Sequence, residues 1–236
     1  MRVRSNSEIS DFADRLAHEL ANIQTGISGY LARLEDYADI DETGRTTFDA
    51  TQRALARNAA LLARLKAVAG RPDTGTRQVD PGPLTVEIAA EIRRTLPGDI
   101  HLRLHLGHGT APLCIDPARY RLALAEMVAN AAEAMQGKGT VHIELSHVAA
   151  ESGGDYVRVA VGDTGHGIAP DLARQVGTPL RTTKAYPHRG WGLAVCAAFC
   201  RQAGGFMEID SAPGQGTCAA LFLPCGTADQ DAGNRA

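Results

Sequence analysis

Apolar side chains recur at steps of three and four residues through the first part of the chain, and this spacing predicts the buried face of a long helix. The positions on this face are Ile9, Phe12, Leu16, Leu20, Ile23, Ile27, Tyr30 and Leu34. After a polar, turn-like stretch at 35–44, a second such face follows at Phe48, Leu55, Ala59, Leu62, Leu65 and Ala69. Gly70 and Pro72 end the pattern. Residues 1–70 are therefore expected to form a hairpin of two helices.

A hairpin of this kind cannot close a hydrophobic core alone, because each helix has a single apolar face. Two hairpins that pair into a four-helix bundle bury both faces, and such assemblies are usually symmetric dimers. The sequence thus predicts a homodimer held together by residues 1–70.

The composition changes after residue 70. Residues 71–83 are rich in glycine and proline and are expected to be a linker. Beyond them, helices are predicted at 84–96, 118–135 and 193–203, and strands at 100–106, 141–148, 156–161, 206–209 and 218–223. This order predicts an α/β domain over 84–225, with helices on one face of a sheet, and a disordered tail at 226–236. The expected fold class is α+β: a dimeric four-helix bundle followed by an α/β sandwich.

The overall composition argues against several classes of protein. Hydrophobic residues make up 44% and charged residues 22%, which is ordinary for a soluble globular chain. The formal net charge of -3 argues against a nucleic-acid-binding surface. No apolar run approaches the length of a membrane span, and the odd number of cysteines, 5, favours a reducing cytosol. We therefore expect a cytoplasmic protein with no nucleic-acid partner and no membrane span.

His18 is the candidate nucleophile of the first helix. It lies about half a turn from Leu16 and Leu20 and so points away from the apolar face. An imidazole is largely uncharged near neutral pH and is then a competent nucleophile, and Glu19 is placed to accept the proton of the other ring nitrogen. Asn22, one turn further on, is a candidate for orienting water towards an acyl phosphate on a docked partner. Taken alone, the three residues are equally consistent with ordinary positions on an exposed helix face.

Two side chains further along the chain are suited to binding Mg²⁺ and ATP. Asn130 shares a helix face with Glu126, four residues earlier, and its amide oxygen suits Mg²⁺, which also takes water and phosphate oxygens. Asp163 follows a predicted strand, where a carboxylate can accept a hydrogen bond from the exocyclic amine of adenine. Guanine has a carbonyl at that edge, so the carboxylate would select adenine.

Glycines complete the pattern expected of a nucleotide pocket. Gly165 and Gly167 let the backbone pass close under a base. Gly190 and Gly192 precede a predicted helix, whose first N–H groups can hold phosphates. The stretch between them, which contains Thr182-Thr-Lys184, is long for a connection and is expected to act as a lid. Each segment alone has an ordinary explanation, a turn glycine or a solvated charge, but their order and spacing make the set specific.

Over residues 8–225 the sequence resembles the two-component sensor histidine kinases. The matching segments are the phosphoacceptor box His18-Glu-Leu-Ala-Asn22, the asparagine box Asn130-Ala-Ala-Glu-Ala134, the first glycine box Asp163-Thr-Gly-His-Gly167, Thr182-Thr-Lys184, the second glycine box Gly190-Trp-Gly-Leu193 and the last, Gly214-Gln-Gly-Thr217. The resemblance implies a dimerisation and phosphotransfer hairpin joined to an ATP-binding domain of the Bergerat fold, which gyrase-type ATPases share.

The resemblance also implies an activity. It implies that His18 is phosphorylated by ATP and that the phosphoryl group passes to an aspartate of a response regulator receiver domain. In the family pattern, Glu19 assists the kinase reaction and Asn22 assists dephosphorylation of the regulator. The signal is expected to come from an upstream sensor protein, from a fused sensor region absent from this sequence, or from the hairpin itself.

The same resemblance assigns the nucleotide site. It implies that Asn130 ligates Mg²⁺, that Asp163 recognises adenine and that Thr217 supports the base site. The implied nucleotide-binding residues are Asn130, Asp163, Gly165, Gly167, Thr183, Lys184, Gly190, Gly192, Leu193 and Thr217. ATP and Mg²⁺ are thus the expected cofactors.

Three positions depart from the family pattern. The second glycine box begins with His188 in place of glycine, and Pro179-Leu180-Arg181 replaces the phenylalanine expected before the two threonines. Glu126 stands where kinases often have asparagine and where gyrase-type ATPases have a glutamate that activates water. Two alternative functions therefore stay open: a gyrase-type ATPase or switch module without histidine phosphorylation, and a phosphotransfer scaffold with an inactive nucleotide domain.

Overall fold

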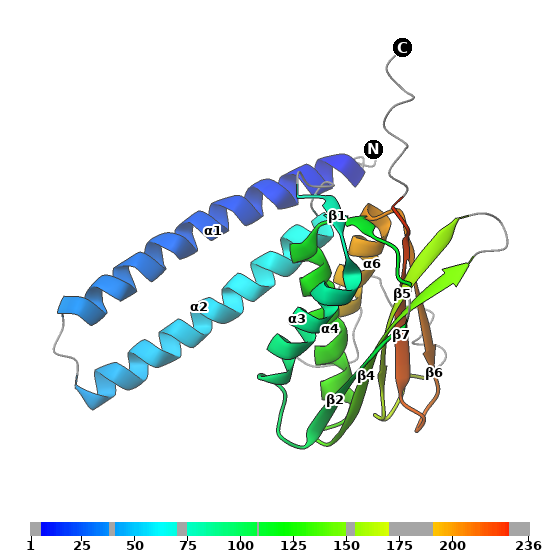
Figure 1. Cartoon of the computed structure of the whole chain (residues 1–236). Helices are drawn as coiled ribbons and strands as arrows, with labels where there is room; N and C mark the ends of the chain where they lie inside the picture. The colour runs from blue at the N-terminus through cyan, green and yellow to red at the C-terminus, as the bar shows by residue number, and fades with distance from the viewer. Residues whose placement is uncertain are drawn as a thin grey trace, which may run out of the picture. The chain divides into compact units, whose positions relative to one another are not determined.

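The computed structural model describes residues 6–37, 41–69, 75–107, 109–149, 154–169 and 191–226. The chain divides into two compact units, Met1–Arg71 and Pro72–Ala236. Figure 1 shows the helices of the first unit in blue and cyan and the sheet of the second from green to red. Within the described ranges, none of the helices combines the length and the apolar character needed to cross a membrane.

The first unit is a hairpin of α1 (Asn6–Tyr37) and α2 (Glu42–Ala69), which run antiparallel (Figure 1). Gln24 joins the two helices, because its Nε2 donates to Leu55 O at 2.9 Å and its Oε1 accepts from Asn58 Nδ2 at 3.3 Å. Asp41 caps α2 by accepting a hydrogen bond from Gly44 N at 2.7 Å. The turn is shorter than the predicted stretch 35–44, because polar residues do not by themselves end a helix and the cap at Asp41 sets where α2 begins.

Much of the predicted apolar face of α1 is exposed to solvent. The exposed residues are Leu20, Ile23, Ile27, Tyr30 and Leu34, whose exposed fractions run from 39% to 70%. Ala17, Phe48 and Leu62, by contrast, are buried. The single chain therefore leaves a long apolar row uncovered along α1, which is the surface that the predicted homodimer requires.

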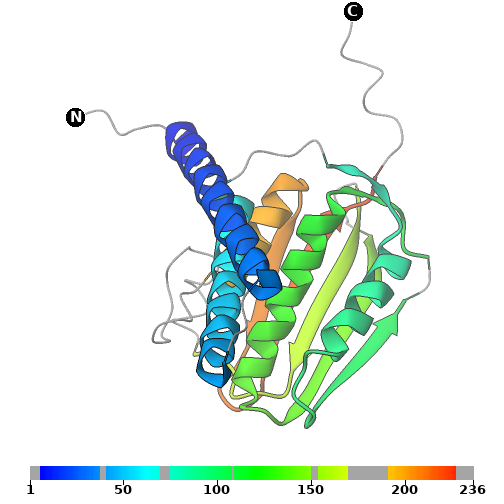
Figure 2. The same cartoon turned by 90° about the vertical axis from the view of Figure 1, so that its left-hand side faces the viewer.

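The second unit is built on a five-stranded sheet with the strand order β2-β4-β5-β7-β6. Its strands are β2 (Ile100–Leu106), β4 (Gly139–Ala149), β5 (Asp155–Asp163), β6 (Phe206–Ser211) and β7 (Thr217–Pro224). β2 and β4 are parallel, and the other neighbours are antiparallel. Three helices cover one face of the sheet (Figure 2): α3 (Pro81–Arg93), α4 (Pro117–Ala134) and α6 (Gly192–Gln202). A small second ladder pairs β1 (Arg77–Val79) with β3 (Leu113–Ile115).

The core lies between this sheet and its helices. Alternate residues of β4 and β5 share one face of the sheet and are buried: Val141, Ile143, Leu145, Val157, Val159 and Val161. Leu124 of α4 and Phe199 of α6 belong to the same cluster, and each buried side chain of this size stabilises the fold by about 1.5–3 kcal/mol. Tyr120 is also buried, its hydroxyl lies 2.6 Å from Thr85 Oγ1, and burial raises its pKa to about 12.

Most predicted elements are present, with shifted ends and two omissions. α3 begins at Pro81, earlier than predicted, because Asp80 caps it by accepting from Gly82 N at 2.9 Å and proline suits the first helical turn. The predicted linker 71–83 therefore contains the start of α3 as well as β1. Neither β1 nor β3 can be recognised in the sequence, because such short strands show no clear alternation. Of the predicted disordered tail at 226–236, all but Gly226 lies outside the described residues.

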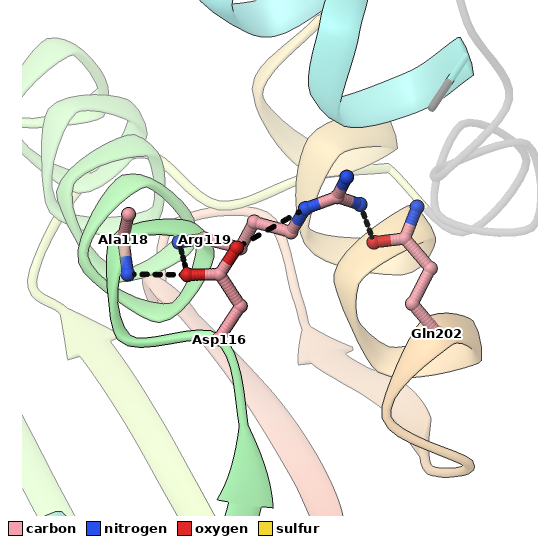
Figure 3. Close-up of polar contacts among 4 residues, drawn as sticks. All are labelled: Asp116, Ala118, Arg119 and Gln202. Carbon is pink, nitrogen blue, oxygen red and sulfur yellow. Dashed lines mark hydrogen bonds and ion pairs between the residues drawn. The ribbon is translucent and has the colours of Figure 1, made fainter. Parts of the chain in front are cut away.

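A polar cluster joins the start of α4 to the end of α6 (Figure 3). Asp116 caps α4, because its Oδ1 accepts from Ala118 N at 2.8 Å and from Arg119 N at 3.4 Å. Its Oδ2 lies 3.5 Å from Arg119 Nε, and both side chains are mostly buried. The Arg119 guanidinium also donates to the side-chain oxygen of Gln202 on α6. This α4–α6 clasp, made of Asp116, Arg119 and Gln202, fixes one end of the helix pair.

Candidate functional site

Asp163, the last residue of β5, is held by the backbone of the loop that follows it and of the first residue of β7. Its Oδ1 accepts hydrogen bonds from Gly165 N at 2.8 Å and from Thr217 N at 3.2 Å. Burial raises the pKa of this carboxyl above its usual range, while the two hydrogen bonds and His166 oppose the rise. Both of these bonds go to Oδ1, and Oδ2 has no hydrogen-bond partner among the described residues. The carboxylate is therefore fixed by one oxygen and leaves the other available to a ligand.

The loop after Asp163 lies close against the end of α4. A Cβ at Gly165 would lie 2.7 Å from Ala134 O, and the same carbonyl accepts a hydrogen bond from His166 N at 3.3 Å. Gly167 has a φ of 70°, and a Cβ there would lie 2.0 Å from Ala212 O. The path of the loop thus requires glycine at both positions, and it brings the backbone of the predicted base site to the last turn of α4.

Ser211, the last residue of β6, ties this loop to the β6–β7 hairpin. Its Oγ accepts from Ile168 N at 2.8 Å, donates to Gly216 O at 2.9 Å and lies 2.9 Å from Thr217 Oγ1. Thr217 therefore contacts Asp163 through its backbone and Ser211 through its side chain. Sequence reasoning found Thr217 and missed Ser211, although the register of the hairpin places the two residues opposite one another.

Asn130 and Glu126 of α4 lie against the first residue of α6. A Cβ at Gly192 would lie 2.7 Å from Asn130 Nδ2 and 3.0 Å from Glu126 Oε2, so a larger residue would collide with both side chains. Glu126 is buried, and Leu193, which follows Gly192, is half-buried. Ala134 lies about one helical turn beyond Asn130. The Asp163 loop and the start of α6 therefore meet at the same end of α4.

The amide of Asn130 fits a bound metal ion or phosphate. Its Nδ2 atom is buried and has no hydrogen-bond partner among the described residues. A buried polar atom without a partner costs about 1–3 kcal/mol, and a ligand at this point removes that cost. Because an amide can turn over about its last bond, its oxygen can face the same space and ligate Mg²⁺. The residues present thus fit the expected nucleotide and its metal ion.

Other predicted residues lie elsewhere in the chain. Thr183, Lys184 and Gly190 belong to the stretch 170–190, which is outside the described residues, so the lid stays a prediction. His18, Glu19 and Asn22 lie in α1 of the first unit, where the side chains of Glu19 and Asn22 are exposed. The residues that meet around the end of α4 are Asn130, Asp163, Gly165, Gly167, Gly192 and Thr217.

Comparison with known sequences places the second unit in a family. Residues 115–227 match the family described as histidine kinase-, DNA gyrase B-, and HSP90-like ATPase. The sensor histidine kinase ZraS of Salmonella typhimurium is 36% identical over 133 residues, which cover 56% of this chain and 28% of that protein. The sensor kinase CckA of Brucella abortus is 27% identical over 229 residues, which cover 92% of this chain and 24% of that protein. The chain thus spans about a quarter of the length of these relatives.

Solved structures of sensor kinases share the fold. Full-length ShkA in complex with AMPPNP has a TM-score of 0.77 at 22% identity, over 93% of this chain and 47% of that one. The mycobacterial sensor histidine kinase MprB has a TM-score of 0.54 at 22% identity, over 63% of this chain and 97% of that one. The predicted helical hairpin and α/β sandwich of the Bergerat type are therefore confirmed. With this fold, this site and these relatives, the chain is a homologue of the sensor histidine kinases ZraS and CckA, with an ATPase domain of the histidine kinase-, DNA gyrase B-, and HSP90-like type at residues 115–227.

Proposed function

We propose that this chain transfers the γ-phosphoryl group of ATP to His18 and then to an aspartate of a response regulator receiver domain. The observation that carries this proposal is the cluster at the end of α4. There, Oδ2 of Asp163 and the buried amide nitrogen of Asn130 both lack a partner among the described residues. Homology to the sensor kinases ZraS and CckA supports a kinase, and the phosphoacceptor sequence at His18 supplies the acceptor.

Recognition of ATP is assigned to two groups at this cluster. Oδ2 of Asp163 accepts a hydrogen bond from the exocyclic amine of adenine, whereas the carbonyl of guanine would face a negative charge. The first N–H groups of α6, beside Asn130, favour phosphate oxygens. Mg²⁺, when bound, neutralises phosphate charge, and Asn130 provides its ligand from the protein.

The phosphoryl transfer itself is assigned to α1. One ring nitrogen of His18 forms a bond to the γ-phosphorus as the bond to the bridging oxygen breaks, and ADP leaves with that oxygen. Glu19, the neighbouring exposed carboxylate, takes up the proton of the other ring nitrogen. Asn22, also exposed, orients water for dephosphorylation of the regulator.

The partner of the first unit is a second copy of the chain. The exposed apolar row on α1, Leu20, Ile23, Ile27, Tyr30 and Leu34, would be covered in a four-helix bundle. Residues 1–70 then serve dimerisation and phosphotransfer, 71–83 connect them to the second unit, and 84–225 bind ATP. The input comes from an upstream sensor protein or a fused sensor region.

Incubation with γ-labelled ATP tests this function. The wild-type chain is expected to gain a label that acid removes, as phosphohistidine does. His18→Gln should gain none while still binding ATP in calorimetry, because the acceptor and the pocket lie in separate units. His142→Gln is the matched control, since His142 is an exposed histidine on β4, and it should label like the wild type. A label that persists in His18→Gln would contradict the assignment.

One observation favours a second function, hydrolysis of ATP without histidine phosphorylation. Glu126 is buried beside Gly192 and Asn130, and a carboxylate at this point can activate a water molecule. Steady release of free phosphate, no label on the chain, and loss of the release in Glu126→Gln would support this function. A chain that gives neither label nor free phosphate would be a phosphotransfer scaffold.

A further inference from the structure

Trp191 is the only tryptophan of the chain and directly precedes Gly192 at the start of α6. It occupies the N-cap position of this helix, but its side chain makes no capping hydrogen bond. The ring is partly exposed, whereas the indole nitrogen Nε1 is buried and has no acceptor among the described residues. An indole N–H can only donate, so this buried group requires an acceptor that the described part of the chain does not provide.

A second unpaired atom lies at the same place in the fold. Within the described ranges, two buried side-chain nitrogen or oxygen atoms have no hydrogen-bond partner, Nε1 of Trp191 and Nδ2 of Asn130. Asn130 Nδ2 lies 2.7 Å from the position that a Cβ of Gly192 would take, and Trp191 is the residue bonded to Gly192. Unpaired buried donors are rare in folded proteins. Two of them in residues that adjoin one glycine, Gly192, indicate that a ligand with several acceptor oxygens belongs at the start of α6.

We propose that the indole N–H of Trp191 donates a hydrogen bond to a phosphate oxygen of the bound nucleotide. This inference rests on the proposed function, which assigns phosphate binding to the first N–H groups of α6. An anionic oxygen is the strongest acceptor for a neutral donor of this kind. The base is recognised at Asp163, in a different loop, so Trp191 distinguishes nucleotides by their phosphates and not by their base.

The single tryptophan makes a direct test possible. In the ¹⁵N-labelled 236-residue chain, Trp191 gives one indole N–H cross-peak in a nuclear magnetic resonance spectrum. Addition of ATP with Mg²⁺ is expected to shift this peak, whereas adenosine, which has no phosphate, should leave it in place. A peak that stays still while calorimetry detects ATP binding would overturn the inference. This measurement needs no variant and so does not depend on whether a variant folds.

Trp191→Phe removes the donor and keeps a flat apolar ring. Its affinity for ATP should fall about tenfold or more, as expected for loss of a hydrogen bond to a charged group, while its affinity for adenosine stays unchanged. Phe206→Leu is the matched control, an exposed aromatic residue on β6, and should change neither affinity.

The outcomes separate this inference from the function on which it rests. Equal weakening of ATP and adenosine binding in Trp191→Phe would show that the ring only supports the fold, and unchanged ATP affinity would show that the indole makes no phosphate contact. Either result overturns the role of Trp191 and leaves the proposed function standing. A wild-type chain that binds no ATP would overturn the proposed function, and this inference with it.

Discussion

Asp163 places a negative charge in a partly buried position, and its raised pKa gives the direction of the effect on stability. The pKa of Asp163 is higher in the folded than in the unfolded state. Its contribution to the free energy of unfolding is therefore fully present at pH values below the unfolded-state pKa, where the carboxyl is neutral. That stabilisation is lost as the pH rises through the folded-state value. At neutral pH the ionised carboxylate therefore lowers stability relative to a neutral group of the same shape. The charge does not stabilise the fold, and we propose that it serves to bind adenine.

Asp163→Asn should separate these two effects. The variant keeps an oxygen for the N–H groups of Gly165 and Thr217 but loses the negative charge that we propose faces adenine. Its ATP affinity should fall about ten- to a hundredfold, the value of one charge-assisted hydrogen bond, while its melting temperature at neutral pH should not fall. Calorimetry with ATP and a thermal melt without it provide the two measurements.

Asp155→Asn is the control for this variant. Asp155 begins the same strand, is exposed, and contacts His147 Nε2 at 3.1 Å. Its replacement should leave ATP affinity unchanged. Unchanged affinity in Asp163→Asn would mean that adenine is bound elsewhere, and a lower melting temperature would mean that Oδ2 has a structural role.

Single residues differ in how well the sequence reveals them. Asp163, Asn130 and the glycines after Asp163 could be predicted as site residues, because each lies in a short segment whose residue types suit one task. Ser211 was not, because its role depends on a contact with Ile168, which is distant in the sequence. Trp191 does not stand out in the sequence for a related reason: its role depends on an indole nitrogen that only the structure shows to be buried and without a hydrogen-bond partner among the described residues.

The helices α4 and α6 pack as a pair, with the candidate site at one end of the pair and the α4–α6 clasp at the other. Asp116, Arg119 and Gln202 join the start of α4 to the end of α6, and Gly192 packs on Asn130 at the opposite end. Between these points, the thiol of Cys196 donates to Ala123 O at 3.4 Å. The clasp therefore helps to set the register in which the first turn of α6 faces Asn130.

Arg119→Met should destabilise the second unit and weaken its ATP binding. The variant leaves the mostly buried carboxylate of Asp116 without its ion-pair partner, which should lower the free energy of unfolding by about 1–3 kcal/mol. Urea unfolding measures this loss, and calorimetry measures the affinity for ATP. The affinity should fall because Gly192 no longer holds its place over Asn130.

Arg121→Met, on the same helix, is the matched control. Arg121 is more exposed and forms ion pairs with Glu87, at 2.7 Å, and with Glu91 on α3. Exposed pairs of this kind contribute about 0.2–1 kcal/mol each. Equal losses of stability in the two variants, or unchanged ATP affinity in Arg119→Met, would show that the clasp does not position the site.

At the level of elements, length decided what could be predicted. Clear periodicity over many residues marks the long helices α1, α2 and α4 and the buried strands β4 and β5. β1 and β3 are too short for that, and the sequence hides the start of α3 because Pro81 stands in a stretch whose glycines and prolines are typical of a linker. The pairing of β1 with β3 depends on contacts between residues that are distant in the sequence. A local sequence pattern does not reveal such contacts.

The exposed row on α1 makes a prediction for the whole molecule. Ile27 is 42% exposed in the single chain, and Ile27→Glu would place a charge inside the proposed four-helix bundle. The wild type should sediment as a dimer in analytical ultracentrifugation, and Ile27→Glu should sediment as a monomer because an unpaired buried charge is highly unfavourable. Asn22→Ala should remain a dimer, since Asn22 lies away from the row. A monomeric wild type would contradict the proposed assembly.

The described ends of the second unit are both attached to one short strand, β3. β1, which follows residue 75, pairs with β3, while Leu113 of β3 also bridges to Cys225, and Gly226 N donates to Pro112 O at 2.9 Å. β3 leads directly into Asp116, the cap of α4. In mechanical terms, tension on the chain where it enters this unit is borne first by the β1–β3 ladder and the first turn of α4. We expect the β1–β3 ladder to shear before the longer strand pairs of the five-stranded sheet separate.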